Sequence, residues 1–166
     1  MKQFVLLFVT LLSSLALAKE KVVFQCNFDE VVVPGSNEGK LVGGFEGSQS
    51  LLVERVDRGS ESRRFAIAGD KFTDRFATLG AVVKAESVSK PPNSWNGIKV
   101  MLVLESASGS KQYPQIQLPS GTFDWKKVTQ RVRLPRDVKR AWLVVGLEEV
   151  RGRATVLHAS CRIHTD

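Results

Sequence analysis

Apolar and polar residues alternate along most of this chain with a period of two. In residues 97–106 every second side chain is a large aliphatic one: Ile98, Val100, Leu102 and Leu104. This is the period of a β-strand that buries one face in a core. The pattern predicts eight to nine strands, and the stretches are 22–28, 49–56, 76–88, 97–106, 111–118, 125–134, 141–148 and 153–163, with short extended pieces near 40–42 and 65–68.

Two late stretches indicate which side chains face outward. In 125–134 the apolar residues Val128, Val132 and Leu134 fall on one face of the predicted strand. The opposite face is polar and carries Lys127, Thr129, Arg131 and Arg133. In 141–148 the apolar parity holds Ala141, Leu143, Val145 and Leu147. Trp142 has the opposite parity, and an indole on the face away from the core is a first indication of a binding surface.

Segments rich in Gly, Pro and polar residues separate these stretches and predict loops or turns: 30–47, 58–64, 70–75, 87–96 and 107–110. We find no convincing amphipathic helix. Many short strands without helices predict an all-β fold, and we expect a jelly-roll β-sandwich of two antiparallel sheets. We prefer it to an immunoglobulin-like sandwich, which usually has about 100 residues and other Cys and Trp spacings.

A set of spaced residues in the C-terminal half resembles a known superfamily. Gly121 opens a G-x-F-D-W-x-x-V motif, the strand ends at Leu134-Pro135, Ala141 opens A-x-L-x-x-G-L, and Gly152 closes the set. The segment from Pro91 to Val100 fits the same pattern. Over about 76–163 the chain resembles jelly-roll carbohydrate-binding modules of the galactose-binding-like superfamily, which are often appended to secreted glycoside hydrolases.

The resemblance implies glycan binding without catalysis. It also implies a structural calcium ion tied to an Asp after the closing Gly. Here Gly152 is followed by Arg153-Ala154-Thr155-Val156-Leu157-His158, which contains no acid. This departure argues against calcium, and we expect no cofactor.

The N-terminus has the pattern of a secretory signal peptide. Lys2 precedes an apolar run, and Ala16-Leu17-Ala18 forms an A-x-A cleavage site before charged Lys19. The apolar run is too short for a membrane span. We expect residues 1–18 to be removed, leaving residues 19–166 as a single β-sandwich domain that is secreted or periplasmic.

The charge of the mature chain excludes some partners. Removing Lys2 with the signal peptide lowers the formal net charge from +7 to +6. No run of Lys or Arg exceeds two residues. Nucleic-acid binding is typical of clustered basic stripes, so we expect no nucleic-acid partner. A preference for acidic polysaccharides stays open and would appear as salt sensitivity.

Two cysteines lie on the predicted first and last strands. In a jelly roll the terminal strands commonly lie side by side, so a disulfide between Cys26 and Cys161 is expected after export. Such a bridge could stabilise the fold by roughly 4–5 kcal/mol on the chain-entropy model. The alternative is two unpaired buried thiols.

Little in the sequence favours catalysis. His158 and His164 are six residues apart on one predicted strand, about 20 Å when extended, so they cannot share a metal ion. No zinc spacing and no G-x-S-x-G elbow is present. Paired carboxylates of a glycosidase stay open, with these candidates: Glu54, Glu86, Glu105, Asp124, Glu148 and Glu149. Asp124 is better explained as a turn residue that binds its own backbone.

Sugar binding uses aromatic faces and planar hydrogen-bonding side chains. Tyr113, Gln115 and Gln117 share one face of stretch 111–118. Arg131 and Arg133 lie on the non-core face of the next stretch, and Trp142 on that of the following one. If these faces adjoin, they form a concave strip suited to a sugar chain.

Trp95 and Trp125 stand where a loop or strand begins, so we expect them at the rim of this strip. Alternatives stay open for each aromatic: Trp125 plugs the end of the core, Trp95 packs under its loop, and a loop covers Trp142. Arg131 and Arg133 could form an ordinary solvated face.

The sequence therefore predicts non-catalytic binding of a polysaccharide or oligosaccharide. The alternative is an envelope or extracellular module that is structural or binds a protein, and a small glycan-active enzyme is a third hypothesis. The sequence does not indicate an oligomeric state.

Overall fold

The computed structural model describes residues 19–28, 40–44, 47–72 and 76–165. Eight strands are present in this part of the chain: β1 (Lys19–Asn27), β2 (Lys40–Gly43), β3 (Gln49–Ala68), β4 (Phe76–Val88), β5 (Gly97–Ser106), β6 (Lys111–Gln112), β7 (Gly121–Arg133) and β8 (Val138–Thr165). One 3-10 turn, Gly69–Lys71, follows β3. All strand pairs are antiparallel, so the predicted all-β class is confirmed.

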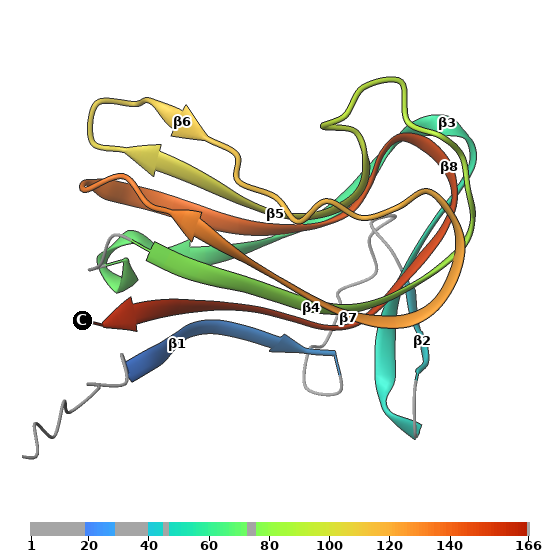
Figure 1. The fold of residues 1–166 in the computed structure, drawn as a ribbon, viewed down its shortest axis with the longest axis horizontal. Helices are drawn as coiled ribbons and strands as arrows, with labels where there is room; N and C mark the ends of the chain where they lie inside the picture. The colour runs from blue at the N-terminus through green and yellow to red at the C-terminus, as the bar shows by residue number, and fades with distance from the viewer. Residues whose placement is uncertain (1–18, 29–39, 45–46, 73–75, 166) are drawn as a thin grey trace, which may run out of the picture.

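The two long strands β3 and β8 belong to both layers of the sandwich. The first part of β8 pairs with β5 and with the second part of β3. Its last part pairs with β4 and β1, and β7 extends that layer beyond β4. Figure 1 shows β8 leaving one layer, bending at one end of the molecule and returning in the other. The expected pair of sheets is thus one hydrogen-bonded sheet folded on itself.

The core lies between the layers and is built from the apolar parities read in the sequence. Its largest fully buried side chains include Phe28, Leu51, Leu79, Leu102, Leu104, Leu143 and Leu147. In β5 and β8 the core residues alternate with residues of the opposite face, as the period of two requires. The predicted orientation of these two strands is confirmed, and Trp142 lies outside the core cluster.

Two predicted breaks between strands are absent from the structure. The predicted turn at 58–64 is wrong, because these residues continue β3 through register shifts near Gly59. Stretches 141–148 and 153–163 belong to one strand, β8. The strand bends between them, where Glu149 and Gly152 have positive φ angles of 54° and 122°. In both places the polar residues and glycines lie at bends within a strand and do not mark the end of a strand.

The predicted strand 111–118 is much shorter than expected. Only Lys111–Gln112 is regular strand. Pro114 has no N–H to donate to a ladder, which explains why regular pairing stops. The backbone nevertheless stays beside β5, where Met101 and Gln115 form an isolated bridge.

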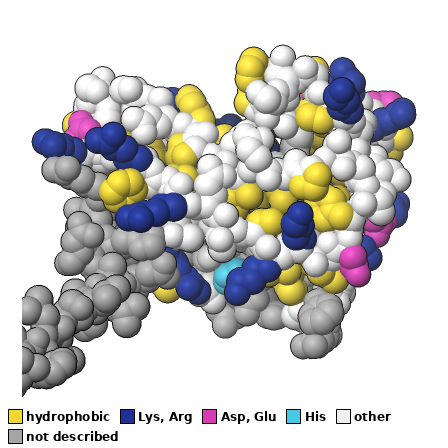
Figure 2. All heavy atoms as spheres, in the orientation of Figure 1, with side chains coloured by type: hydrophobic (Ala, Val, Ile, Leu, Met, Phe, Trp, Pro, Cys, Tyr) yellow, Lys and Arg dark blue, Asp and Glu magenta, His cyan; other side chains and the backbone are white. Residues whose placement is uncertain are grey.

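Several expectations fall on residues outside the described ranges. They include the signal peptide and most of the loop 30–47, while the side chains of Cys26 and His164 are likewise not described. No helix in the described ranges has the length and hydrophobicity needed to cross a membrane. Figure 2 shows Lys and Arg side chains scattered over the face drawn, without the single stripe typical of nucleic-acid-binding domains.

The terminal strands lie side by side, as expected, but Cys161 is a free, buried thiol. The β1–β8 register pairs Cys26 with Ala159 and Cys161 with Phe24. The two cysteines are therefore not opposite one another, and the predicted bridge is not formed in this structure.

We expect iodoacetamide at pH 8 to leave Cys161 unmodified in the folded protein and to alkylate it after unfolding in urea. Burial raises the pKa of the Cys161 thiol to about 12, and only the thiolate reacts. Because this folded-state pKa is raised, the associated stability is complete below pH 9 and is lost as pH rises toward 12. Peptide mass spectrometry measures the modification. A linked Cys26–Cys161 peptide from unreduced protein would instead support the sequence prediction.

Candidate functional site

The face of the β5 layer that points away from the core forms the floor of a groove. In β5, Lys99, Met101 and Val103 alternate with the core residues and line this floor. In β8, Val144 lies beside Met101 in the register and continues the floor. The alternation of the two central strands thus assigns one parity to the core and the other to the groove.

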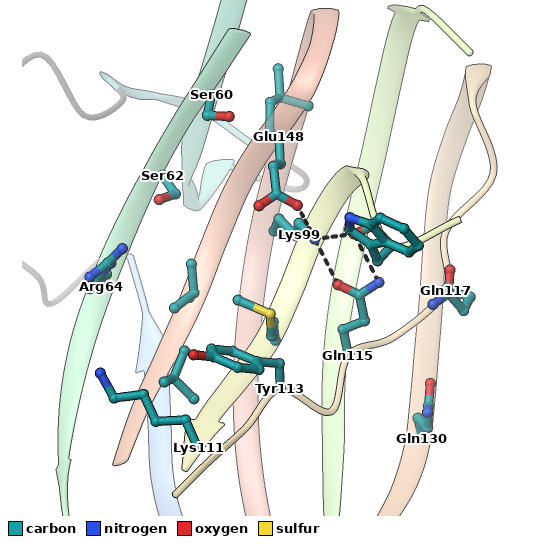
Figure 3. Close-up of a pocket in the computed structure, with 15 residues that line it drawn as sticks. Ser60, Ser62, Arg64, Lys99, Lys111, Tyr113, Gln115, Gln117, Gln130 and Glu148 are labelled. Atoms are coloured by element: carbon teal, nitrogen blue, oxygen red, sulfur yellow. Dashed lines mark hydrogen bonds and ion pairs between the residues drawn. The ribbon is translucent and has the colours of Figure 1, made fainter. Parts of the chain in front are cut away.

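The groove has a volume of about 810 Å³. It is lined by Ser60, Ser62, Arg64, Trp95, Lys99, Met101, Val103, Lys111, Tyr113, Gln115, Gln117, Gln130, Val144, Leu147 and Glu148. Figure 3 shows β3 on one side of the floor and the segment after β6 on the other. The groove is therefore built from four separate parts of the sequence around the floor: β3, the loop before β5, β6 with the segment after it, and β7.

Backbone pairing fixes the segment after β6 against β5. The N–H of Leu102 donates to the carbonyl oxygen of Pro114, and the N–H of Ile116 donates to that of Val100, both at 2.9 Å. Ile116 is buried in the core. Because Ile116 points inward, the neighbouring Gln115 and Gln117 are directed toward the groove.

Lys99 is the centre of a hydrogen-bonded network in the floor. Its side chain is nearly buried, and Nζ forms an ion pair with Glu148. Nζ also donates to Gln115 Oε1 at 2.8 Å and to the backbone carbonyl oxygen of Trp95. A buried ammonium group needs such partners, because an unpaired charge there costs several kcal/mol.

The same network holds the loop before β5. Gln115 Nε2 donates to the Trp95 carbonyl oxygen at 3.1 Å, and Asn96 Nδ2 donates to Glu148 Oε2 at 3.1 Å. These bonds fix the backbone of Trp95 while its indole stays 61% exposed. Tyr113 is 56% exposed. Two aromatic side chains are thus presented at the groove on restrained backbone.

A smaller space of about 280 Å³, here called the side hollow, adjoins the groove and shares Arg64, Val103 and Lys111 with it. Trp142, Arg140 and Glu105 complete its lining. Arg140 Nε donates to Glu105 Oε1 at 3.1 Å. The Arg140 guanidinium lies 5.9 Å from the centre of the Trp142 ring, within cation–π distance.

The structure brings together five of the eight side chains chosen from the sequence. Trp95, Tyr113, Gln115 and Gln117 line the groove, and Trp142 lines the side hollow. The exposure of Trp95 contradicts the alternative in which it packs under its loop.

Arg131, Arg133 and Trp125 line neither space. They belong to β7, which pairs with β4 in the other layer and does not pair with the first part of β8. The Arg131 guanidinium lies 4.3 Å from the centre of the Phe76 ring. The expectation that Arg131 and Arg133 share one outer face with Tyr113 and Trp142 was therefore wrong, and β7 lines the groove with Gln130, which has the opposite parity.

Sequence reasoning missed other lining residues. The lining includes three residues of the predicted turn at 58–64: Ser60, Ser62 and Arg64. Because a turn has no alternating faces, the sequence did not indicate which way these side chains point. Lys99 and Glu148 were visible as charged residues on apolar strands. A charged residue on the face of an apolar strand that points away from the core is the sequence signal that indicates such a site residue.

Most of the candidate catalytic carboxylates have identified partners. Glu54 and Glu86 pair with Arg153, whose pKa is raised chiefly by the hydrogen bond to Glu54. Glu149 accepts a hydrogen bond from the Ser60 hydroxyl at 3.2 Å. As expected, Asp124 Oδ1 accepts a hydrogen bond from a neighbouring backbone N–H, that of Trp125, at 2.8 Å. The expectation of a turn is wrong, because Asp124 lies within β7.

The described residues contain no group of three or more His, Cys, Asp or Glu side chains that could hold a metal ion. The pKa of His158 is lowered by burial and then by the positive charges of Arg162 and Lys127. A neighbourhood of cations does not favour a cation site around this imidazole.

The chain is similar to solved carbohydrate-binding modules. It aligns with a family 22 xylan-binding domain over 87% of this chain and 96% of that one, with a TM-score of 0.58 and 20% identity. It also aligns with the xylan-binding domain CBM22-1 of Paenibacillus barcinonensis Xyn10C, over 91% and 99%, with a TM-score of 0.53 and 17% identity.

A third similar structure is the C-terminal family 22 module of Clostridium thermocellum Xyn10B, with a TM-score of 0.54, 20% identity and coverage of 75% and 79%. No protein-family model matches the chain, and no curated protein matches it in sequence. At these identities the likeness defines the fold. The chain has the jelly-roll β-sandwich of carbohydrate-binding modules, as the sequence motifs indicated.

Proposed function

We propose that this protein binds a polysaccharide or oligosaccharide in the groove without catalysing a reaction. The observation that carries the proposal is the exposure of Trp95 and Tyr113 at a groove that also holds several amide side chains. Aromatic rings stack on the apolar faces of sugar rings, and amides hydrogen-bond sugar hydroxyls. The floor contributes Met101, Val103 and Val144 as further apolar surface.

The size and shape of the groove support a chain-like ligand. The volume of about 810 Å³ lies in the upper part of the range of ligand pockets, which is roughly 300–1,000 Å³. Two of the similar structures are described as xylan-binding domains. A β-1,4-linked pentose chain is therefore the first ligand to test on this protein.

The positions of the acids support binding over hydrolysis. Glycosidases place two carboxyl groups about 5–10 Å apart. The two carboxylates of the groove and side hollow, Glu148 and Glu105, lie at opposite ends of β5, because Glu148 pairs with Gly97. Eight residues of strand separate these positions, or about 26 Å. Both carboxylates are also held in ion pairs.

Export and a single mature domain of residues 19–166 complete the proposal. The A-x-A site after the apolar N-terminal run supports export. An extracellular or periplasmic location would place the groove where polysaccharides occur.

Native affinity electrophoresis tests the function directly. We expect a gel that contains soluble xylan to retard the protein and a gel that contains bovine serum albumin not to do so. Retention on none of a panel of xylan, mixed-linkage glucan, galactan and glucuronoxylan would contradict the proposal and favour the alternative of an interaction module. Release of reducing sugar from a retained glycan would instead indicate an enzyme.

A further inference from the structure

The charges around the groove do not cancel. Among the described residues, four basic side chains line the groove and the side hollow: Arg64, Lys99, Lys111 and Arg140. Only two carboxylates line them, Glu105 and Glu148. The lining therefore has a formal net charge of +2.

The ion pairs show which cations are left over. Lys99 is paired with Glu148, and Arg140 is paired with Glu105. Lys111 Nζ lies 3.9 Å from Glu105 Oε2, and Arg140 already pairs with Oε1 of the same carboxylate. The side chain of Lys111 is half exposed. Arg64 is exposed and lies within ion-pair distance of no carboxylate in the described chain. Arg64 and Lys111 are thus the cations available to a ligand.

These two residues form one end of the groove, here called the cationic end. They come from β3 and β6, which stand on opposite sides of the floor, and both residues also line the side hollow. Figure 3 shows both on the side of the groove away from Gln117, with the Tyr113 hydroxyl directed toward them. A guanidinium, an ammonium and a phenol hydroxyl are donors that suit an anion next to an aromatic ring.

We propose that the cationic end binds the anionic substituent of an acidic glycan, a carboxylate or a sulfate ester, while the neutral part of the chain lies toward Trp95. This inference rests on the proposed function, because it assigns the ligand class of the same groove. Arg64 offers two parallel N–H donors to an oxyanion, and Lys111 adds a point charge from the opposite side. The anion is held at the rim, where both cations are accessible without breaking the Lys99 network.

The test compares one polysaccharide with and without its charge. We expect the full chain to bind glucuronoxylan about tenfold more tightly than the same polysaccharide after carboxyl reduction, at 20 mM salt, which is the scale of a charge-assisted hydrogen bond. The difference should shrink in 500 mM NaCl, because rim charges are screened. A sulfated galactan and its desulfated form provide the second arm and distinguish sulfate from carboxylate.

Two variants assign the effect to these residues. Arg64→Gln and Lys111→Gln should each abolish most of the difference in affinity between the charged and the carboxyl-reduced polysaccharide. Lys126→Gln removes the same charge from an exposed position on β7 outside both spaces and should retain the preference.

The outcomes separate this inference from the proposed function. Equal affinity for the charged and uncharged forms, in both arms, overturns the inference and leaves sugar binding intact. Failure to bind any of these charged and uncharged polysaccharides, and also xylan and mixed-linkage glucan, overturns both. Because the comparison of charged and reduced glycans needs no variant, a folding defect in Arg64→Gln does not affect it.

Discussion

Replacing Trp95 with Ala is expected to weaken glycan binding by about 10- to 100-fold. An indole that becomes buried against a sugar contributes roughly 1.5–3 kcal/mol, and each 1.4 kcal/mol is a factor of ten in affinity. The side chain is 61% exposed in the free protein, so the free energy of unfolding should change by less than about 0.5 kcal/mol. Isothermal titration calorimetry with a soluble oligosaccharide of a retained glycan measures the loss.

The chain offers a matched control for this substitution. The Trp95 interactions that hold the groove, with Lys99 and Gln115, use its backbone carbonyl oxygen and persist in the Ala variant. Trp125→Ala removes an indole that lines neither the groove nor the side hollow and should leave the affinity unchanged. Equal affinity of the Trp95→Ala variant and the unsubstituted protein would exclude stacking on this indole.

Gly146→Ala is expected to lower the free energy of unfolding by about 3 kcal/mol, at the upper end for overpacking of a buried site. Gly146 pairs with Ser62 of β3 and Lys99 of β5 in the middle of the floor. A Cβ atom there would lie 2.5 Å from the Ser62 Cα atom and also too close to the Glu61 carbonyl oxygen. Strand β3 would have to move away from β8.

Gly43→Ala is the control, because a Cβ atom at Gly43 meets no atom within 4 Å. Urea denaturation of both variants compares their free energies of unfolding. If Gly146→Ala unfolds at the same urea concentration as Gly43→Ala, the close approach of β3 and β8 in this structure is wrong.

The fold was predictable where alternation was regular. The bounds of β4 and β5 agree with the stretches read from the sequence, 76–88 and 97–106. The bends of β3 and β8 were not predictable from local sequence, because Gly, Ser and charged residues serve bends as well as turns. Only pairing with distant strands, such as that of Glu61 with Leu147, keeps these residues extended.

The site was predictable on the strands whose parity was read correctly. The predicted face of 111–118 lines the groove with Tyr113, Gln115 and Gln117, although most of this segment is not regular strand. The buried Ile116 anchors the segment in the core and so keeps its neighbours directed outward. Arg64 was missed because its segment was assigned to a turn. The choice of Arg131 failed for another reason: parity separates the two faces of a strand but does not tell which surface each face borders, and on β7 the neighbouring Gln130 lines the groove instead.

The passage of β3 and β8 through both layers has a consequence for how the molecule opens. A sandwich made of two separate sheets could part along its core, with each sheet keeping its hydrogen bonds. Here β3 and β8 continue from one layer into the other, so the layers cannot part unless these strands break their ladders. Loss of one layer must therefore propagate along the chain to the other, and amide protons on both should exchange with solvent in a single opening event.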